Sequence, residues 1–450
     1  MSQSTIQSPS FNLWTEPWIT IEQEDGGLAE VGIEQILSEA HKYHSLYDPS
    51  PLVIVGIHRL LIAILQSIHN PQTNQDLAKI WRTNRFADES IQEFGTRYAH
   101  CFDLFSENAP FLQSADLPLS PPKRAESYVV TLMDETPSGT ATRHYNHINE
   151  EDQIFCSVCA AKGLALVPSF SKATGQGYRT SITGVPPLYL IPGGRVLFHS
   201  LVASLLTRQF QPKAAHPEVD TPWWNHSPIV TAKLEMTRIG YVQSLTLPSR
   251  KVRLHPMKMT KVCDRCGNMT AWAVRTIAYA MGEYRPKEAT FWQDPFVAYK
   301  SSSEQKSAPS PVYMPKGQDV WREFAAIFLS SERTTGGTIR PSVIDQIVEL
   351  QNEGVISDEY AYPFRVIGMR IDDMKAKVTA WSESGFEIPP RVLAEPLVAS
   401  LIENGIEYTT ECAKHIARTF RHHFGGDSSK SEKHQHLRQC SDFAGTIRSK

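Results

Sequence analysis

The chain has 450 residues, of which 41% are hydrophobic and 21% are charged, and its formal net charge at pH 7 is −3. This length is typical of two or three domains with a large buried core, and this composition excludes an intrinsically disordered protein. The nearly balanced charge disfavours a protein that binds nucleic acid alone and indiscriminately, because such proteins are usually basic overall.

The first half of the chain predicts a strand, two helices and then irregular structure. The first helix is expected to begin at Pro51, because Ser50 is a favoured N-cap and proline suits the first turn. The segment 136–152 is rich in Ser, Thr, Gly, Asn and His, and is interpreted as a mobile loop. The elements predicted before it are an opening strand over 11–21, a turn at Asp25-Gly26-Gly27, the helix from Pro51 to Ile64, a second helix at about 76–100 and, from Pro118, a stretch without helical periodicity.

The rest of the chain is predicted to contain further helices. A polar connector bearing Ser and Pro occupies 301–311. A helical pattern runs from Val392 to about Phe424, with a break expected near Gly405. The other predicted helices lie at about 197–210, 270–281, 319–329 and 344–352.

Two Cys-x-x-Cys pairs, Cys156/Cys159 and Cys263/Cys266, are the strongest chemical signal. Thiolates separated by two residues can face one ion, and two such pairs complete a tetrahedral site. The sequence therefore predicts a structural Zn²⁺ that joins two distant segments. A catalytic zinc is disfavoured, because four thiolates leave no open position for water and no His-x-Glu element accompanies the pairs.

Three alternatives for these cysteines remain open. They could be buried free thiols. They could form a redox dithiol, although nothing around either pair resembles a thioredoxin unit. A local site could also combine Cys156 and Cys159 with His144 and His147.

The cysteine pairs bracket two stretches without any acidic residue, Gln153 to Pro217 and Met236 to Cys263. About ten acids would be expected there at the average composition of the chain. The absence of acids predicts a surface that holds a polyanion. The basic residues in these stretches include Lys162, Lys172, Arg179, Arg195, Arg208, Lys213, Arg238, Arg250, Lys251, Arg253, Lys258 and Lys261.

A short glycine-containing segment lies inside the first acid-free stretch. Glycines let backbone amides approach a phosphate or a groove edge, while Lys172 and Arg179 supply charge. Neither the Walker ending nor the third glycine of the dinucleotide fingerprint follows, so an ordinary tight turn is the alternative. The residues predicted to contact nucleic acid here are Lys172, Gly175, Gln176, Gly177, Tyr178 and Arg179.

Other features favour structural roles. The pairs Trp223-Trp224 and Phe291-Trp292 are interpreted as packing aromatics. No carboxylate pair, Ser-His or Cys-His arrangement has catalytic spacing. Seven cysteines are too few for a disulfide scaffold, the N-terminus has no signal segment, and the apolar run 52–68 is interrupted by His58 and Arg59. These features predict a cytoplasmic protein without a membrane span.

Several motifs, in the right order over roughly residues 11–385, resemble the large subunit of Cascade, the type I-E CRISPR surveillance complex. The opening segment Phe11-Asn12-Leu13-Trp14-Thr15-Glu16-Pro17-Trp18-Ile19 carries much of this resemblance. The other matching segments are 59–63, 110–113, 137–139 with His147, the Cys156 pair, 175–181, 186–189, 292–299 and 368–370.

This resemblance implies a non-catalytic subunit that recognises the protospacer-adjacent motif in double-stranded DNA. It also implies that the chain helps open the duplex for guide RNA pairing, and docks a separate helicase-nuclease. The family's glycine loop matches 175–179, and Lys287 is the choice for its lysine finger. The strand-separating wedge falls at Asp373 and Met374, where this sequence lacks the family's glutamine. The loop at 136–149 resembles the family loop that contacts guide RNA and duplex.

The expected fold class is α+β. A large, mixed and irregular N-terminal domain with the zinc site is expected over 1–385, followed by a shortened C-terminal helical bundle at 386–427 and a disordered tail at 428–450. The implied partners are guide RNA, other Cascade subunits, target DNA and the helicase-nuclease. Two alternatives are a structural subunit that holds guide RNA and a zinc-stapled nuclease.

Overall fold

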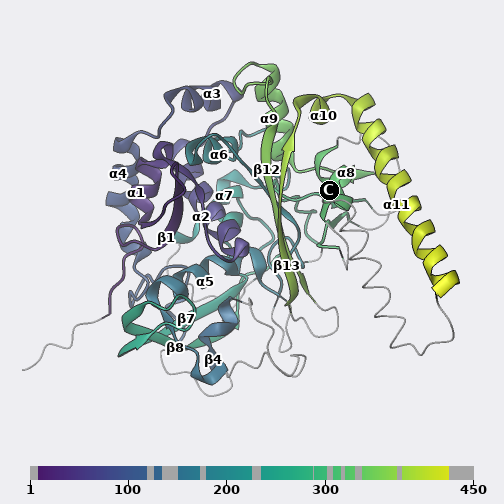
Figure 1. Cartoon of the computed structure of the whole chain (residues 1–450). Coiled ribbons are helices and arrows are strands. Elements are labelled where there is room, and N and C mark those ends of the chain that lie inside the picture. Colours follow the sequence, from purple (N-terminus) through teal and green to yellow (C-terminus); the bar gives the residue numbers. More distant parts are fainter. Residues whose placement is uncertain are drawn as a thin grey trace, which may run out of the picture. The chain divides into compact units, whose positions relative to one another are not determined.

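A computed structural model shows the arrangement of the chain (Figure 1). It describes residues 9–118, 126–133, 150–172, 179–225, 235–286, 288–301, 308–315, 320–329, 337–371 and 378–424. The chain divides into two compact units, Met1–Pro390 and Arg391–Lys450. Helices and strands are mixed throughout the first unit, as the α+β prediction requires.

The N-terminus forms a small antiparallel sheet with the order β2-β1-β3. The expected opening strand is shorter than predicted, because β1 covers only Ile19–Gln23. The predicted turn is confirmed: Gly26 has a φ of +82°, a conformation that favours glycine. The remaining elements of this region are β2 (Leu28–Val31), α1 (Ile33–Ser38), a 3-10 helix (Ala40–Lys42) and β3 (Tyr43–Leu46).

The core of the first unit is built on α2, Pro51–His69. Its predicted start is confirmed, with Ser50 at the N-cap and Pro51 in the first turn. Among the described helices, α2 is the one long and apolar enough to cross a membrane, but 89% of its apolar window is buried inside the protein. That is the environment of a core helix.

A second apolar helix, α5 (Ser157–Phe170), packs against α2 and was not predicted. The two helices approach closely at Gly56, where a Cβ atom would lie 2.5 Å from the carbonyl oxygen of Ala165. All residues of α5 except Val158 are buried, and the helix contains Gly163 and Pro168. It therefore lacks the amphipathic periodicity by which helices are recognised.

The prediction of one helix over 76–100 is wrong. The segment forms α3 (Asn74–Thr83) and α4 (Asp88–Tyr98), followed by a 3-10 helix (Ala99–Phe102). The break falls at Asn84, whose φ of 54° is left-handed. Asparagine tolerates this conformation, which ends α3.

The prediction of a helix at 270–281 is also wrong, because this segment is the strand β8 (Met269–Met281). It forms a long antiparallel hairpin with β7 (Arg250–Val262), and α5 packs against this hairpin (Figure 1). Two short strands, β4 (Glu126–Tyr128) and β5 (Phe155–Cys156), pair with the other side of β8. The alanines and methionines of β8 favour a helix locally, but the pairing with three strands holds the segment extended.

A third sheet has the order β13-β12-β6, with β6 at Tyr189–Pro192, β12 at Tyr362–Ile371 and β13 at Val378–Ile388. A fourth contains β9 (Tyr299–Lys300), β10 (Ser310–Pro311) and β11 (Thr338–Ile339). The helix predicted at 344–352 is confirmed as α9 (Ser342–Asn352), whereas those predicted at 197–210 and 319–329 are shorter. The short helices are α6 (Leu197–Ala203), α7 (Tyr241–Leu245), α8 (Phe324–Phe328) and 3-10 helices at Val129–Leu132, Glu150–Asp152, Pro217–Val219, Trp223–Asn225 and Val320–Glu323.

A buried ion pair crosses the core of the first unit. Arg59 on α2 donates to both carboxylate oxygens of Asp294, at 3.2 and 2.8 Å, and its guanidinium carbon lies 5.1 Å from the ring centroid of Tyr189. Elsewhere Trp223 and Trp224 pack against Phe102, which confirms their structural interpretation.

The second unit is helical. It contains most of α10 (Pro390–Ala394) and all of α11 (Pro396–Phe424). The expected break at Gly405 is wrong, since α11 continues through it. Residues 425–450, including the predicted tail, lie outside the described part of the chain.

Candidate metal centre and the segments that lead from it

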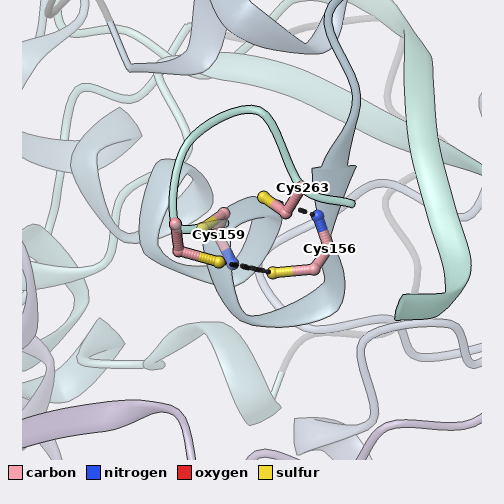
Figure 2. A group of neighbouring side chains, drawn as sticks. Cys156, Cys159 and Cys263 are labelled. Atoms are coloured by element: carbon pink, nitrogen blue, oxygen red, sulfur yellow. Dashed lines mark hydrogen bonds between the residues drawn. The ribbon is translucent and has the colours of Figure 1, made fainter. Parts of the chain in front are cut away.

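The four predicted cysteines come together, although the two pairs are far apart in the sequence. Figure 2 shows Cys156, Cys159 and Cys263 turned toward one another. The four Sγ atoms all lie within 4.8 Å of one another; they belong to Cys156, Cys159, Cys263 and Cys266. Cys156 ends β5 and caps α5, while Cys263 and Cys266 lie in the turn between β7 and β8.

The cluster has the dimensions of a four-thiolate zinc site. Zinc–sulfur bonds of ~2.3 Å place tetrahedral sulfurs about 3.8 Å apart, and the Sγ atoms of Cys156 and Cys266 are 3.7 Å apart. Backbone N–H groups support the sulfurs: Cys159 N donates to Cys156 Sγ at 3.4 Å, and Cys156 N to Cys263 Sγ at 3.3 Å (Figure 2). Gly267 has a φ of +76°, which closes the second pair tightly.

The electrostatics of the cluster favour a cation. Hydrogen bonds from the Cys156 and Cys159 thiols hold the pKa of Cys263 far below its ordinary value. Hydrogen bonding to Cys156 and Cys263 raises the pKa of Cys159 well above its ordinary value. Adjacent thiolates repel one another, so a divalent cation is what allows all four sulfurs to ionise together.

A network of charged side chains links the cysteine cluster to the core. Arg265, between the second pair of cysteines, donates to Cys159 Sγ at 3.9 Å and to Asp48 Oδ1 at 2.7 Å. Asp48 also pairs with Lys162 of α5 at 3.0 Å. Because Asp48 is buried just before α2, these contacts tie both cysteine segments to the N-terminal core.

Two elements lead from the metal centre to segments predicted to contact DNA. The helix α5 begins at the first cysteine pair, and its end leads to 173–178, which contains the predicted glycine loop. A backbone hydrogen bond from Ser181 N to Ser171 O, 3.2 Å, closes the base of this segment. The strand β8 begins after the second pair, and its end leads through Tyr284 and Arg285 toward Lys287.

The segments that follow α5 are in contact with the far end of the β7–β8 hairpin and with the segment that follows β8. Arg250, which pairs with Met281 at the end of the hairpin, donates from Nη2 to the carbonyl oxygen of Lys172 at 2.7 Å. The guanidinium of Arg179 lies over the ring of Tyr284, 4.8 Å from its centroid. These contacts join the base of the predicted glycine loop to the segment before the predicted lysine finger.

The predicted wedge begins in the same region. Met369, on β12 just before 372–377, lines a small cavity of about 30 Å³ together with Lys172 and Arg250. Three segments that are far apart in the sequence therefore start from one place. Of the residues predicted to contact DNA, Lys172 is buried and Arg179 is exposed. The others, Gly175, Gln176, Gly177, Tyr178, Lys287, Asp373 and Met374, lie outside the described residues.

The acid-free stretches do not form a uniformly basic surface. Lys162 is buried against Asp48, and Lys251 is buried with Asp116 at 2.6 Å. Arg253 is buried as well, and exposed Arg238 pairs with Glu218. The acids that neutralise these residues come from other parts of the sequence, which is why local composition did not reveal them.

Sequence reasoning missed Tyr284, Glu235 and Arg250. Tyr284 stands three residues before Lys287, and Arg250 was noted only as part of a basic stretch. Their pairings with Arg179 and Lys172 join segments that have no signal in common, so only the tertiary structure reveals them.

The chain is similar to known proteins over most of its length. The family model described as CRISPR-associated protein Cse1 matches residues 12–447. CRISPR-associated protein CasA/Cse1 of Thermus thermophilus is 28% identical over 423 residues, which cover 91% of this chain and 77% of that protein.

Solved structures of Cse1 proteins have a similar fold. Thermus thermophilus CasA (Cse1) matches with a TM-score of 0.70 and 25% identity, covering 91% of this chain and 83% of the other. Cse1 from Acidimicrobium ferrooxidans shares the fold, with a TM-score of 0.74 at 21% identity, covering 91% of this chain and 77% of the other. These matches confirm the predicted resemblance, and the chain belongs to the CRISPR-associated Cse1 family, the large subunit of the type I-E Cascade complex.

Proposed function

We propose that this chain is the DNA-reading, non-catalytic subunit of an RNA-guided surveillance complex in the cytoplasm. It recognises the protospacer-adjacent motif in duplex DNA and helps open the duplex, so that guide RNA pairs with the target strand. It also docks a separate helicase-nuclease. In this division of labour the protein reads a short motif and the backbone, while base pairing reads the sequence.

One observation carries this proposal: the three segments predicted to contact DNA start from one place. Arg179 stacks on Tyr284, and Lys172, Arg250 and Met369 line one small cavity. Described residues that neighbour the predicted glycine loop, lysine and wedge lie close together, which supports contact of all three segments with a single short stretch of duplex. A shared fold with a chain of a CRISPR RNA-guided surveillance complex, with a TM-score of 0.69 at 19% identity, agrees with this role.

We further infer that the four cysteines hold a structural Zn²⁺. The ion would fix the starts of α5 and β8 relative to each other, and thereby the positions of the segments at their far ends. Four thiolates complete the tetrahedral coordination, so this site is not proposed to activate water.

The proposal is tested by duplex-DNA binding of the guide-loaded complex, prepared with and without this chain. The targets carry either the intact or a scrambled flanking motif. We expect the chain to raise affinity for the intact motif by at least about tenfold, since each misread base pair typically costs about 1–3 kcal/mol. An affinity that depends on neither the chain nor the motif would contradict the recognition role.

The alternative of a structural subunit that holds guide RNA makes a different prediction. The substitution Gly175→Asp adds a side chain and a negative charge to the glycine loop. We expect the complex to assemble normally and to lose binding to the intact target, because a carboxylate in the loop would repel DNA phosphates. Failed assembly, measured by the stoichiometry of the purified complex, would instead favour the structural role.

A further inference from the structure

Arg179 is the first described residue after 173–178, and its side chain is exposed. Its guanidinium lies over the Tyr284 ring at 4.8 Å, within the distance of a cation–π interaction. A guanidinium that lies over a ring keeps N–H donors that can bind other groups.

Tyr284 is itself fixed at two points by the segment that precedes α7. Its carbonyl oxygen accepts a hydrogen bond from Met236 N at 2.8 Å. Its hydroxyl donates to Glu235 Oε2 at 3.4 Å. A phenol that donates to a carboxylate carries more electron density in its ring, which strengthens the attraction of a stacked cation.

The edge of the Arg179 guanidinium has no protein partner among the described residues. Two other exposed arginines already use this edge: Arg238 pairs with Glu218, and Arg208 donates to Gln211 at 3.2 Å. Arg179 is thus held over the Tyr284 ring, while its planar set of donors remains available. That geometry matches the two oxygens of a phosphate group.

We propose that Tyr284 and Glu235 are positioning residues that present Arg179 to a DNA backbone phosphate. This inference rests on the proposed function and deepens it. Arg179 sets the register of the duplex and reads no base, so motif recognition belongs to other residues. The contact also joins Arg179, which follows the predicted glycine loop, to Tyr284, which precedes Lys287.

The experiment uses the whole guide-loaded complex and duplex targets with intact or scrambled motifs, at several salt concentrations. We expect Arg179→Gln to weaken binding to both targets by the same factor, about three- to tenfold. It should also lower the magnitude of the slope of log affinity against log salt concentration by about one. Tyr284→Ala should reproduce much of both effects. Tyr284→Phe, which keeps the ring but loses the hydrogen bond to Glu235, should give an affinity and a slope between those of the wild type and Tyr284→Ala.

The double variant Arg179→Gln/Tyr284→Ala should bind no more weakly than Arg179→Gln alone, because Tyr284 acts through Arg179. The matched control is Arg97→Gln, an exposed arginine on α4 that already neighbours Glu93 at 3.8 Å. It should leave affinity and slope unchanged. Melting temperature and incorporation into the complex check that each variant folds.

Three outcomes overturn the inference. Loss of affinity for the intact motif alone would mean that Arg179 reads bases. If the fold loss of affinity in the double variant equalled the product of the two single losses, Tyr284 would not act through Arg179. An unchanged salt slope in Arg179→Gln would mean that no phosphate contact exists. If the wild-type chain does not raise DNA affinity at all, the proposed function itself fails, which distinguishes that failure from the other three.

Discussion

At the scale of single residues, Glu283 is a buried carboxyl group just beyond the end of β8. It is 4% exposed, and its Oε2 atom has no hydrogen-bond partner among the described residues. Burial raises its pKa from 4.5 to about 7. The folded chain therefore binds this proton more tightly than the unfolded chain, so this contribution to stability is fully present below pH 4.5 and is lost as the pH rises towards 7.

We expect Glu283→Gln to remove this pH dependence. Because the amide does not ionise, the variant should be more stable than the wild type at pH 8, by about 1–3 kcal/mol, and nearly equal to it at pH 4. Denaturant unfolding at the two pH values measures this difference. Glu93→Gln, at an exposed position of α4, serves as the control and should change the stability at pH 8 by less than about 1 kcal/mol. An equal effect of Glu283→Gln at both pH values would contradict the assigned pKa.

The Arg59–Asp294 ion pair makes a second prediction at this scale. Its side chains are 3% and 1% exposed, so neither charge can regain water if the other is removed. We expect Asp294→Ala to cost about 3–5 kcal/mol, because it leaves a buried guanidinium unpaired. Glu93→Ala breaks the exposed pair with Arg97 and should cost less than about 1 kcal/mol. Equal costs in denaturant unfolding would mean that burial does not set the strength of the pair.

At the scale of elements, the contact between α2 and α5 depends on a missing side chain. Alanine is a better helix former than glycine by about 1 kcal/mol, so propensity alone favours Gly56→Ala. The added Cβ would lie 2.5 Å from the backbone oxygen of Ala165, which cannot move without shifting α5. We therefore expect a net destabilisation of about 1–3 kcal/mol.

Gly405 in α11 provides the matched control. A Cβ added there would meet nothing within 4 Å. Gly405→Ala should therefore stabilise its helix by about 0.5–1 kcal/mol. Thermal unfolding followed by circular dichroism compares the two variants. If both substitutions stabilised the protein, the close approach of α2 and α5 would be wrong.

At the scale of the whole molecule, the proposed zinc joins two segments that are far apart in the sequence: Cys156 and Cys263 are separated by 107 positions. Removing it should free the starts of α5 and β8 together, because both leave the same cluster. We expect Cys263→Ser to abolish stoichiometric zinc, to lower the melting temperature by about 10 °C or more, and to weaken DNA binding. Elemental analysis and hydrogen exchange over α5 and β8 measure these effects.

The control for the metal is Cys412→Ser, since this half-exposed cysteine of α11 lies outside the cluster. It should keep one zinc per chain and normal hydrogen exchange. Purified wild-type chain without any bound metal, but with full stability, would contradict the structural role of the ion.

Several features were predictable because their signals lie within a few residues of each other. Ser50 and Pro51 marked the start of α2, and Gly26 marked the first turn. The spacing within each cysteine pair predicted that all four sulfurs would meet, and the ordered motifs predicted the family. By contrast, α5 has no polar face to give it a period, and β8 was mistaken for a helix because the pairing with β7 outweighs local propensity.

The sequence by itself therefore determined the family, the mixed fold, the main core helix and the cysteine cluster, since each depends on residue types at short, regular spacing. Only the tertiary structure decided which basic residues are exposed, because their neutralising partners, such as Asp48 and Asp116, lie far away along the chain. It alone also placed Arg179 on Tyr284. Such contacts depend on how two elements pack, and packing is a property of the folded chain as a whole rather than of any local segment.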